Sequence, residues 1–125
     1  MGILKVTVEV EHPASRGHRS PPIMAMVDTG SEYTWLPRPV LEAMALSPER
    51  TEHFQMADGT VLERPICFAV LHVAGTSAVD HVVFGEPGDL ALLGARALEG
   101  LNLRVDLVAR RLVAAGPIVA AVGAR

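Results

Sequence analysis

Residues 25–37 read Ala25-Met26-Val27-Asp28-Thr29-Gly30-Ser31-Glu32-Tyr33-Thr34-Trp35-Leu36-Pro37. The apolar run from Ile23 to Val27 predicts a buried strand that ends at the carboxylate of Asp28. An Asp-Thr-Gly tripeptide is by itself also a common turn that closes a strand without chemistry. Here Gly30 lets backbone N–H groups approach the carboxylate, because glycine has no side chain in the way, and Ser31 can add a hydroxyl donor. The stretch therefore predicts a carboxylate held rigidly at the end of a buried strand.

The length of 125 residues predicts one domain over 1–125, large enough for a core and too small for a two-lobed enzyme. The net charge of −3 and the scattered arginines argue against a nucleic-acid partner. A single cysteine, Cys67, excludes an intramolecular disulfide and fits a reducing compartment. The chain shows no signal-peptide pattern and no apolar run near the ~20 residues of a membrane span. We therefore expect a soluble, cytoplasmic protein that does not act at a membrane.

Strand-like patterns recur along the chain, beginning with Ile3 to Glu11, where valines alternate with polar residues. A polar, proline-bounded loop over 12–22 is predicted to separate this strand from Ile23 to Val27. Further strands are predicted at 53–56, 60–62, 66–73, 78–84, 90–94, 103–107 and 111–115, and short helices at 37–46 and 95–101. The short apolar tail, 116–125, is compatible with one more strand. The sum predicts a mostly β domain with a closed, barrel-like sheet and one or two short helices.

Asp58-Gly59 lies between two strand-like segments, which is a strong signal for a hairpin. A two-residue type I′ turn needs positive φ at both central residues, and Asp-Gly suits it. A hairpin with its tip over Met56 to Thr60 is therefore expected.

This order of parts resembles the retropepsin-like aspartic proteases, single-lobe enzymes that include the retroviral proteases and small bacterial and archaeal relatives. Two motifs carry the resemblance, which covers roughly Ile3 to Val113: the Asp28 loop with its Trp-Leu-Pro exit, and Ala91-Leu92-Leu93-Gly94. The second motif matches the hydrophobic-hydrophobic-Gly element that lies behind the catalytic loop in that family. The resemblance implies an acid-protease fold and a homodimer in which two Asp-Thr-Gly loops meet across a twofold axis.

The resemblance also implies roles for individual residues. Asp28 becomes the catalytic carboxylate, and the Thr29 hydroxyl bonds across the dimer to the partner's loop. Gly30 supplies a backbone donor near the carboxylates, and Ser31 an outer hydrogen bond. The flap that closes over substrate consists of Met56, Ala57, Asp58, Gly59 and Thr60, and the rear support consists of Leu92, Leu93 and Gly94.

The chain departs from the family pattern in two places. Its flap has one glycine where retroviral flaps are glycine-rich, and it lacks the flap tyrosine of pepsins. Ala95 stands where retroviral proteases have an arginine that forms an ion pair behind the active site. Arg96 either reaches Glu32 instead or is a solvated helix residue.

The chemistry needs two carboxylates a few ångströms apart, one acting as general base on a water and the other polarising the scissile carbonyl. The chain has a single Asp-Thr-Gly, so a monomer holds half of such a site. The sequence thus predicts a homodimeric aspartic endopeptidase that acts on peptide or protein substrates. The alternative is a non-catalytic dimerisation or peptide-binding module that keeps the fold, although a degenerate member would be expected to lose Asp, Thr or Gly.

Other kinds of site are disfavoured. The histidines show no metal-binding spacing, so neither a metal nor another cofactor is expected. Ser31 is not part of a G-x-S-x-G elbow, and the loop 85–88 lacks the Lys-Ser/Thr of a phosphate loop.

Overall fold

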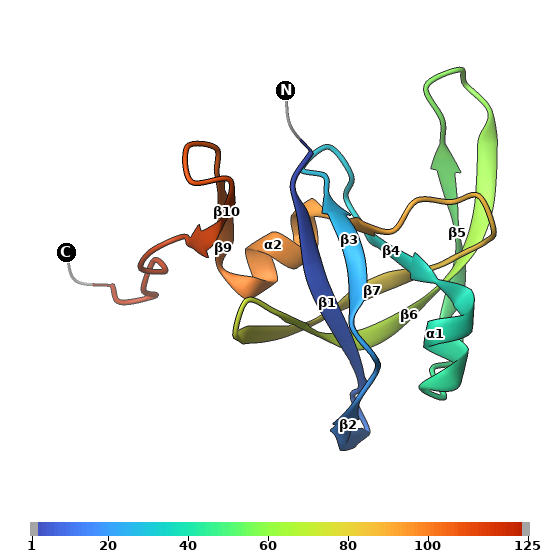
Figure 1. The fold of residues 1–125 in the computed structure, drawn as a ribbon, viewed down its shortest axis with the longest axis horizontal. Helices are drawn as coiled ribbons and strands as arrows, with labels where there is room; N and C mark the ends of the chain where they lie inside the picture. Colours follow the sequence, from blue (N-terminus) through green and yellow to red (C-terminus); the bar gives the residue numbers. More distant parts are fainter. Residues whose placement is uncertain (1–2, 124–125) are drawn as a thin grey trace.

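The computed structural model describes residues 3–123 and contains an eight-stranded sheet, a separate two-stranded sheet and two short helices (Figure 1). The strands are β1 (Lys5–His12), β2 (Ser15–Arg19), β3 (Ile23–Val27), β4 (Thr34–Pro37), β5 (Arg50–Gln55), β6 (Val61–Val73), β7 (Thr76–Gly85), β8 (Leu92–Leu93), β9 (Leu103–Asp106) and β10 (Arg111–Ala114). The helices are α1 (Arg38–Ala43) and α2 (Ala95–Leu101). The prediction of a mostly β fold with short helices is confirmed.

Part of the large sheet closes on itself. Its strand order is β2-β1-β3-β8-β4-β7-β6-β5, and β1 pairs additionally with β6 through Glu9↔His72, Val10↔Leu71 and Glu11↔Val70. The strands from β1 to β6 in this order therefore form a ring, while β2 and β5 lie outside it. The separate hairpin of β9 and β10 follows α2 and lies to one side of the ring in Figure 1.

A largely aliphatic core fills the ring. Alternate residues of β1, Val8 and Val10, are fully buried, and Phe84 of β7 and Leu93 of β8 are fully buried with them. Leu41 of α1 and Ala97 of α2 add the helices to the same cluster. Burying one such large side chain stabilises the fold by about 1.5–3 kcal/mol. Strands that pack around this core hold the connections between them in fixed positions.

The predicted loop over 12–22 contains a strand, β2, which continues the hairpin with β1. All five residues of β2 are exposed, so the segment carries no alternation of apolar and polar residues that could reveal it. Glu11, which is 3% exposed, holds β2 in position. Its carboxylate accepts a hydrogen bond from the Gly17 N–H and forms an ion pair with the Arg16 Nε.

The segments predicted as two strands, 60–62 and 66–73, form the single long strand β6. Pro65 lies in the gap between the two predicted segments. The ladder with β7 begins only at Ile66↔Val83, so at Pro65 the strand pairs with β5 alone. Proline is tolerated where one side of a strand is unpaired.

The ends of several elements also differ from the prediction. Helix α1 is shorter than 37–46, because Pro37 belongs to β4 and Ala45 adopts φ 60° just after the helix. The described part of the tail, 116–123, contains no strand, and 124–125 lie outside the described residues. Within residues 3–123, neither helix is long or apolar enough to span a membrane.

Candidate active site

The carboxylate of Asp28 is held at the end of β3 by backbone groups. Strand β8 runs parallel to β3 with Val27 opposite Leu93, and the Asp28 N–H donates to the Leu93 carbonyl over 3.0 Å. The Gly30 N–H donates to Asp28 Oδ1 over 2.9 Å. Asp28 is half-buried and Thr29 and Gly30 are exposed. The loop therefore presents one oriented carboxylate at the surface of the ring.

The predicted rear support lies directly behind this loop. At Gly94 the backbone passes so close to the loop exit that an added Cβ would lie 2.5 Å from the Tyr33 carbonyl oxygen. The Gly94 N–H donates to the hydroxyl of buried Thr34 over 3.0 Å, and the Ala95 N–H donates to the Ser31 carbonyl over 2.7 Å. Only glycine fits this approach, which explains why the apolar pair before it ends at a glycine.

The structure places the Ser31 hydroxyl differently from the prediction. Ser31 Oγ donates to the Tyr33 carbonyl over 2.9 Å, so its hydrogen is not directed at Asp28. Its role is to hold the bend at the loop exit. Among the described residues Thr29 makes no side-chain hydrogen bond, and its exposed hydroxyl is free for a group outside the chain.

Arg96 does reach Glu32, the first of the two options left open by the sequence. The Nε–Oε2 distance is 3.1 Å, and the guanidinium also lies 5.7 Å from the centre of the Tyr33 ring. Both side chains are exposed, at 52% and 75%, so the pair is worth at most about 1 kcal/mol. The ion pair ties α2 to the loop without contributing much to its stability.

A hairpin of β5 and β6 stands out from the ring at the upper right of Figure 1. Its exposed tip is Met56 to Thr60. The Met56 N–H donates to the Thr60 carbonyl over 2.7 Å, which leaves a three-residue loop closed by Gly59 at φ 90°. The predicted hairpin is present, but the predicted type I′ turn is wrong, because Asp58 does not adopt positive φ. The Thr60 hydroxyl and N–H bind Asp58 and hold the pKa of its carboxyl below the usual range.

One face of this hairpin contacts the exit of the Asp28 loop. Cross-strand partners Phe54 and Leu62 share this face with Glu52 and Arg64. The Tyr33 hydroxyl donates to Glu52 Oε2 over 3.1 Å, and the Phe54 ring lies 4.9 Å from the Trp35 ring. Sequence reasoning missed these contacts, although the period-two spacing of the four hairpin residues could have shown that they share a face.

The other aspartates are engaged in contacts of their own. Asp58 binds Thr60, Asp80 accepts the His81 N–H, and Asp89 binds Arg64. Asp106 accepts the Val108 and Ala109 N–H groups, which lower its pKa, with Ala109 the larger cause. Among the described residues, one carboxylate per chain therefore occupies a loop of the Asp-Thr-Gly kind.

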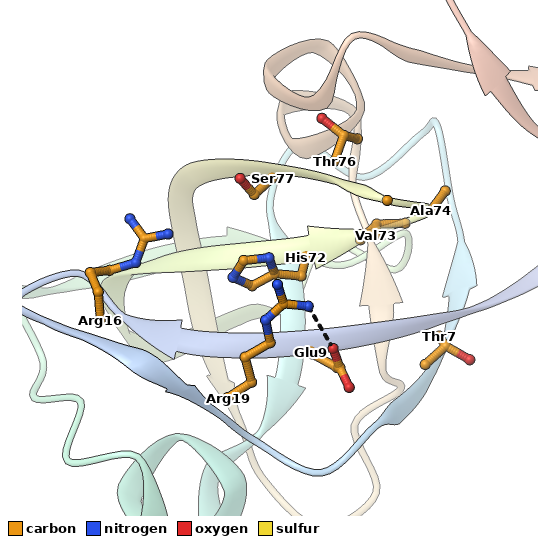
Figure 2. Close-up of a pocket in the computed structure, with 10 residues that line it drawn as sticks. Thr7, Glu9, Arg16, Arg19, His72, Val73, Ala74, Thr76 and Ser77 are labelled. Carbon is orange, nitrogen blue, oxygen red and sulfur yellow. Dashed lines mark hydrogen bonds and ion pairs between the residues drawn. The ribbon is translucent and has the colours of Figure 1, made fainter.

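A groove of about 530 Å³ lies elsewhere, between β1, β2 and the β6–β7 turn (Figure 2). Neither the Asp28 loop nor the hairpin tip lines it. Its two arginines are already paired: Arg19 contacts Glu9 at 3.1 Å, as the dashed line in Figure 2 marks, and Arg16 contacts Glu11 at 2.9 Å. Because these charges are compensated, the groove does not compete with the Asp28 loop as the candidate site. The described residues contain no cluster of three or more side chains suited to a metal ion.

Comparison with known proteins agrees with this geometry. Residues 18–100 match the profile of a protein family described as "gag-polyprotein putative aspartyl protease". The match includes the Asp28 loop, the β5–β6 hairpin, β8 and most of α2. No curated protein matches the chain.

Proposed function

Since the chain belongs to the gag-polyprotein aspartyl protease family, we propose that it is an aspartic endopeptidase whose site forms between two copies of the chain. Each copy contributes one Asp28. The single observation that carries the proposal is the Asp28 carboxylate, oriented by the Gly30 N–H at 2.9 Å at the end of a strand supported from behind by β8. Such preorganisation of a carboxylate by backbone donors is what general acid–base chemistry requires.

In the proposed reaction the two Asp28 carboxyl groups share one proton, because two carboxyl groups at such a short separation cannot both be ionised. The ionised carboxylate removes a proton from a water, whose oxygen attacks the scissile carbonyl carbon. The protonated carboxyl donates its proton to the carbonyl oxygen, which gives a tetrahedral diol. The diol then collapses: one of its hydroxyl protons passes to the carboxylate that had protonated the carbonyl oxygen, the C–N bond breaks, and the leaving nitrogen takes the proton from the carboxyl that had accepted it from water. A carboxylic acid and an amine result, and the pair regains its shared proton.

The site itself calls for a dimer, because each chain presents one Asp28 carboxylate of this kind. Several large apolar side chains are also exposed, among them Ile3 at 63%, Leu107 at 84%, Val108 at 96%, Ile118 at 78% and Val119 at 83%. Burial of such side chains against a second copy would remove apolar surface from water. A second copy of this chain is the occupant that the half-site at Asp28 requires.

The proposal is tested by incubating a diverse peptide pool with the wild-type protein and with Asp28→Asn. Cleavage by the wild type that is lost in the variant, and blocked by a statine-type analogue whose hydroxyl replaces the attacking water, is the expected result. Cleavage by both proteins, or cleavage abolished by a chelator and untouched by the analogue, would refute it. Peptide binding without cleavage by either protein would favour a peptide-binding module that keeps this fold.

A further inference from the structure

The stem of the β5–β6 hairpin is held to the rest of the molecule mainly by side chains. Among the described residues, 50–55 pair only with β6, and β6 pairs with β7 only from Ile66 onward. Within residues 3–123 the hairpin over 50–65 therefore has no backbone ladder to the ring. Its orientation depends on the few side chains that reach across from it.

On the β6 side that contact is made by Arg64. Its Nε and Nη2 donate to Asp89 Oδ2 over 2.8 Å and to Oδ1 over 3.1 Å, which is a two-bonded fork. Both side chains are only 17% exposed. Asp89 Oδ2 also accepts the Glu86 N–H over 2.8 Å, so the carboxylate is fixed to its own loop. A paired, largely buried arginine–carboxylate fork sets direction as well as distance.

Asp89 lies in the connection that leads into the support of the Asp28 loop. Two residues later, the Ala91 carbonyl accepts the Met26 N–H of β3 over 2.9 Å. The chain then becomes β8, whose Leu93 carbonyl accepts the Asp28 N–H. Arg64 thus joins the hairpin to the segment that positions the carboxylate.

We propose that Arg64 and Asp89 are a positioning pair that sets the angle of the hairpin over the Asp28 loop. The proposal rests on the proposed function in taking the hairpin as the flap that closes over substrate. Neither side chain touches the reacting atoms. The pair determines how often the hairpin occupies the closed position and leaves the chemistry to Asp28.

Glu86, in the same loop as Asp89, offers a matched control. Arg38 of α1 binds Glu86 through Nη2 at 2.6 Å and Nε at 2.8 Å, with exposures of 31% and 37%. This second ion pair ties the loop to α1 and not to the hairpin. Glu86→Gln therefore removes a comparable contact from the loop while leaving the hairpin attached.

The first test is hydrogen exchange of the folded, full-length protein, which does not depend on catalysis. In Arg64→Gln and Asp89→Asn, amides over 50–65 are expected to exchange at least about tenfold faster, the factor for losing one charge-assisted hydrogen bond. The Asp89→Asn side chain still has an amide oxygen that can accept the Glu86 N–H, so this variant leaves the loop's own hydrogen bond in place. Exchange over 23–27 is expected to stay unchanged, and Glu86→Gln is expected to leave the hairpin as in the wild type. Equal hairpin exchange in all proteins, or the same acceleration in Glu86→Gln, would overturn the proposal.

The second test is steady-state cleavage of a peptide that the wild type cuts. A positioning role predicts that kcat and KM both change in Arg64→Gln, as they do for hinge residues, with kcat/KM reduced by about tenfold. Loss of folded protein alone would lower kcat at constant KM and would count against the proposal. Arg64→Lys keeps the charge without the fork and is expected to give intermediate values. If the wild type cleaves nothing, the proposed function fails, and the exchange experiment still decides the role of the pair.

Discussion

At Gly94 two backbones meet with no room for a side chain, and this contact places the Asp28 loop. Gly94 has φ −92° and ψ 176°, a conformation open to any residue, so the need for glycine here is purely steric. In Gly94→Ala the new Cβ would collide with the Tyr33 carbonyl, and the backbone must shift. We expect a loss of about 1–3 kcal/mol in the free energy of unfolding, measured by urea denaturation. Gly123→Ala is the control, since no atom of residues 3–123 outside its chain neighbours lies within 4 Å of the Cβ that it would gain. Equal stability of the two variants would contradict this account.

Glu11 is a buried charge whose partners make stability depend on pH. The Gly17 N–H, followed by His72 and Arg16, lowers the pKa of Glu11 from 4.5 to about 2, against the opposing effect of burial. A carboxyl whose pKa is depressed by folding contributes stability above its unfolded pKa and loses it as pH falls toward the folded value. The stability difference between wild type and Glu11→Gln is therefore expected to be present above pH 4.5 and to shrink as the pH falls from 4.5 to about 2.

Urea denaturation across this pH range measures the effect. Glu63→Gln serves as the control, because Glu63 is 67% exposed and, in the part of the chain that the structure describes, forms an ion pair with His53 alone. A difference between wild type and Glu11→Gln that did not change with pH would show that the contacts of Glu11 do not stabilise its charged form.

Among the elements, the β5–β6 hairpin is the one expected to move. Its tip needs the positive φ of Gly59, which a β-branched residue strongly disfavours. Gly59→Val is expected to reduce peptide cleavage while the proposed dimer, measured by sedimentation, stays intact. Gly75→Val is a matched control: it places the same strain, at φ 80°, in the β6–β7 turn, which forms no part of the proposed flap. If both variants lowered turnover equally, backbone strain and not a flap role of the hairpin would explain the loss.

Hydrogen exchange in the unliganded protein tests the mobility of the β5–β6 hairpin in a second way. Backbone amides over 56–60 are expected to exchange much faster than those over 23–27, because the tip is exposed and β3 lies between β1 and β8 in the ring. Equal protection of the two segments would argue that the hairpin is not a lid.

At the scale of the whole molecule, a site shared by two chains gives a stoichiometric signature. In mixtures of wild type and Asp28→Asn at fixed total concentration well above the dimer dissociation constant, random pairing leaves active sites only in pure wild-type dimers. Cleavage is expected to fall as about the square of the wild-type fraction. Labelled subunits check that exchange is complete. A linear fall after full exchange would mean that each chain works alone, and the shared site would have to be abandoned.

Local patterns in the sequence were sufficient for several parts of this protein. The strand into Asp28, the hairpin at Asp58-Gly59 and helix α2 over 95–101 follow from alternation, turn residues and apolar spacing within a few neighbours. These features are readable because the residues that determine them are adjacent in the chain. The place of Gly94 behind the loop follows instead from the family resemblance, and its close approach to the Tyr33 carbonyl supplies the physical reason for a glycine there.

The tertiary structure decided the rest. Strand β2 has no buried residue, and β6 runs through a proline, so their pairing depends on partners and not on pattern. The burial of Glu11 against His72 and the fork of Arg64 with Asp89 join residues 61 and 25 positions apart. Such contacts form only when the sheet closes and brings distant segments together. Each of these side chains is polar, so the local sequence does not show that it is buried in an ion pair and not solvated. The sequence by itself determined where the carboxylate lies and what turns surround it, and closure of the ring determined what holds that carboxylate and the hairpin in place.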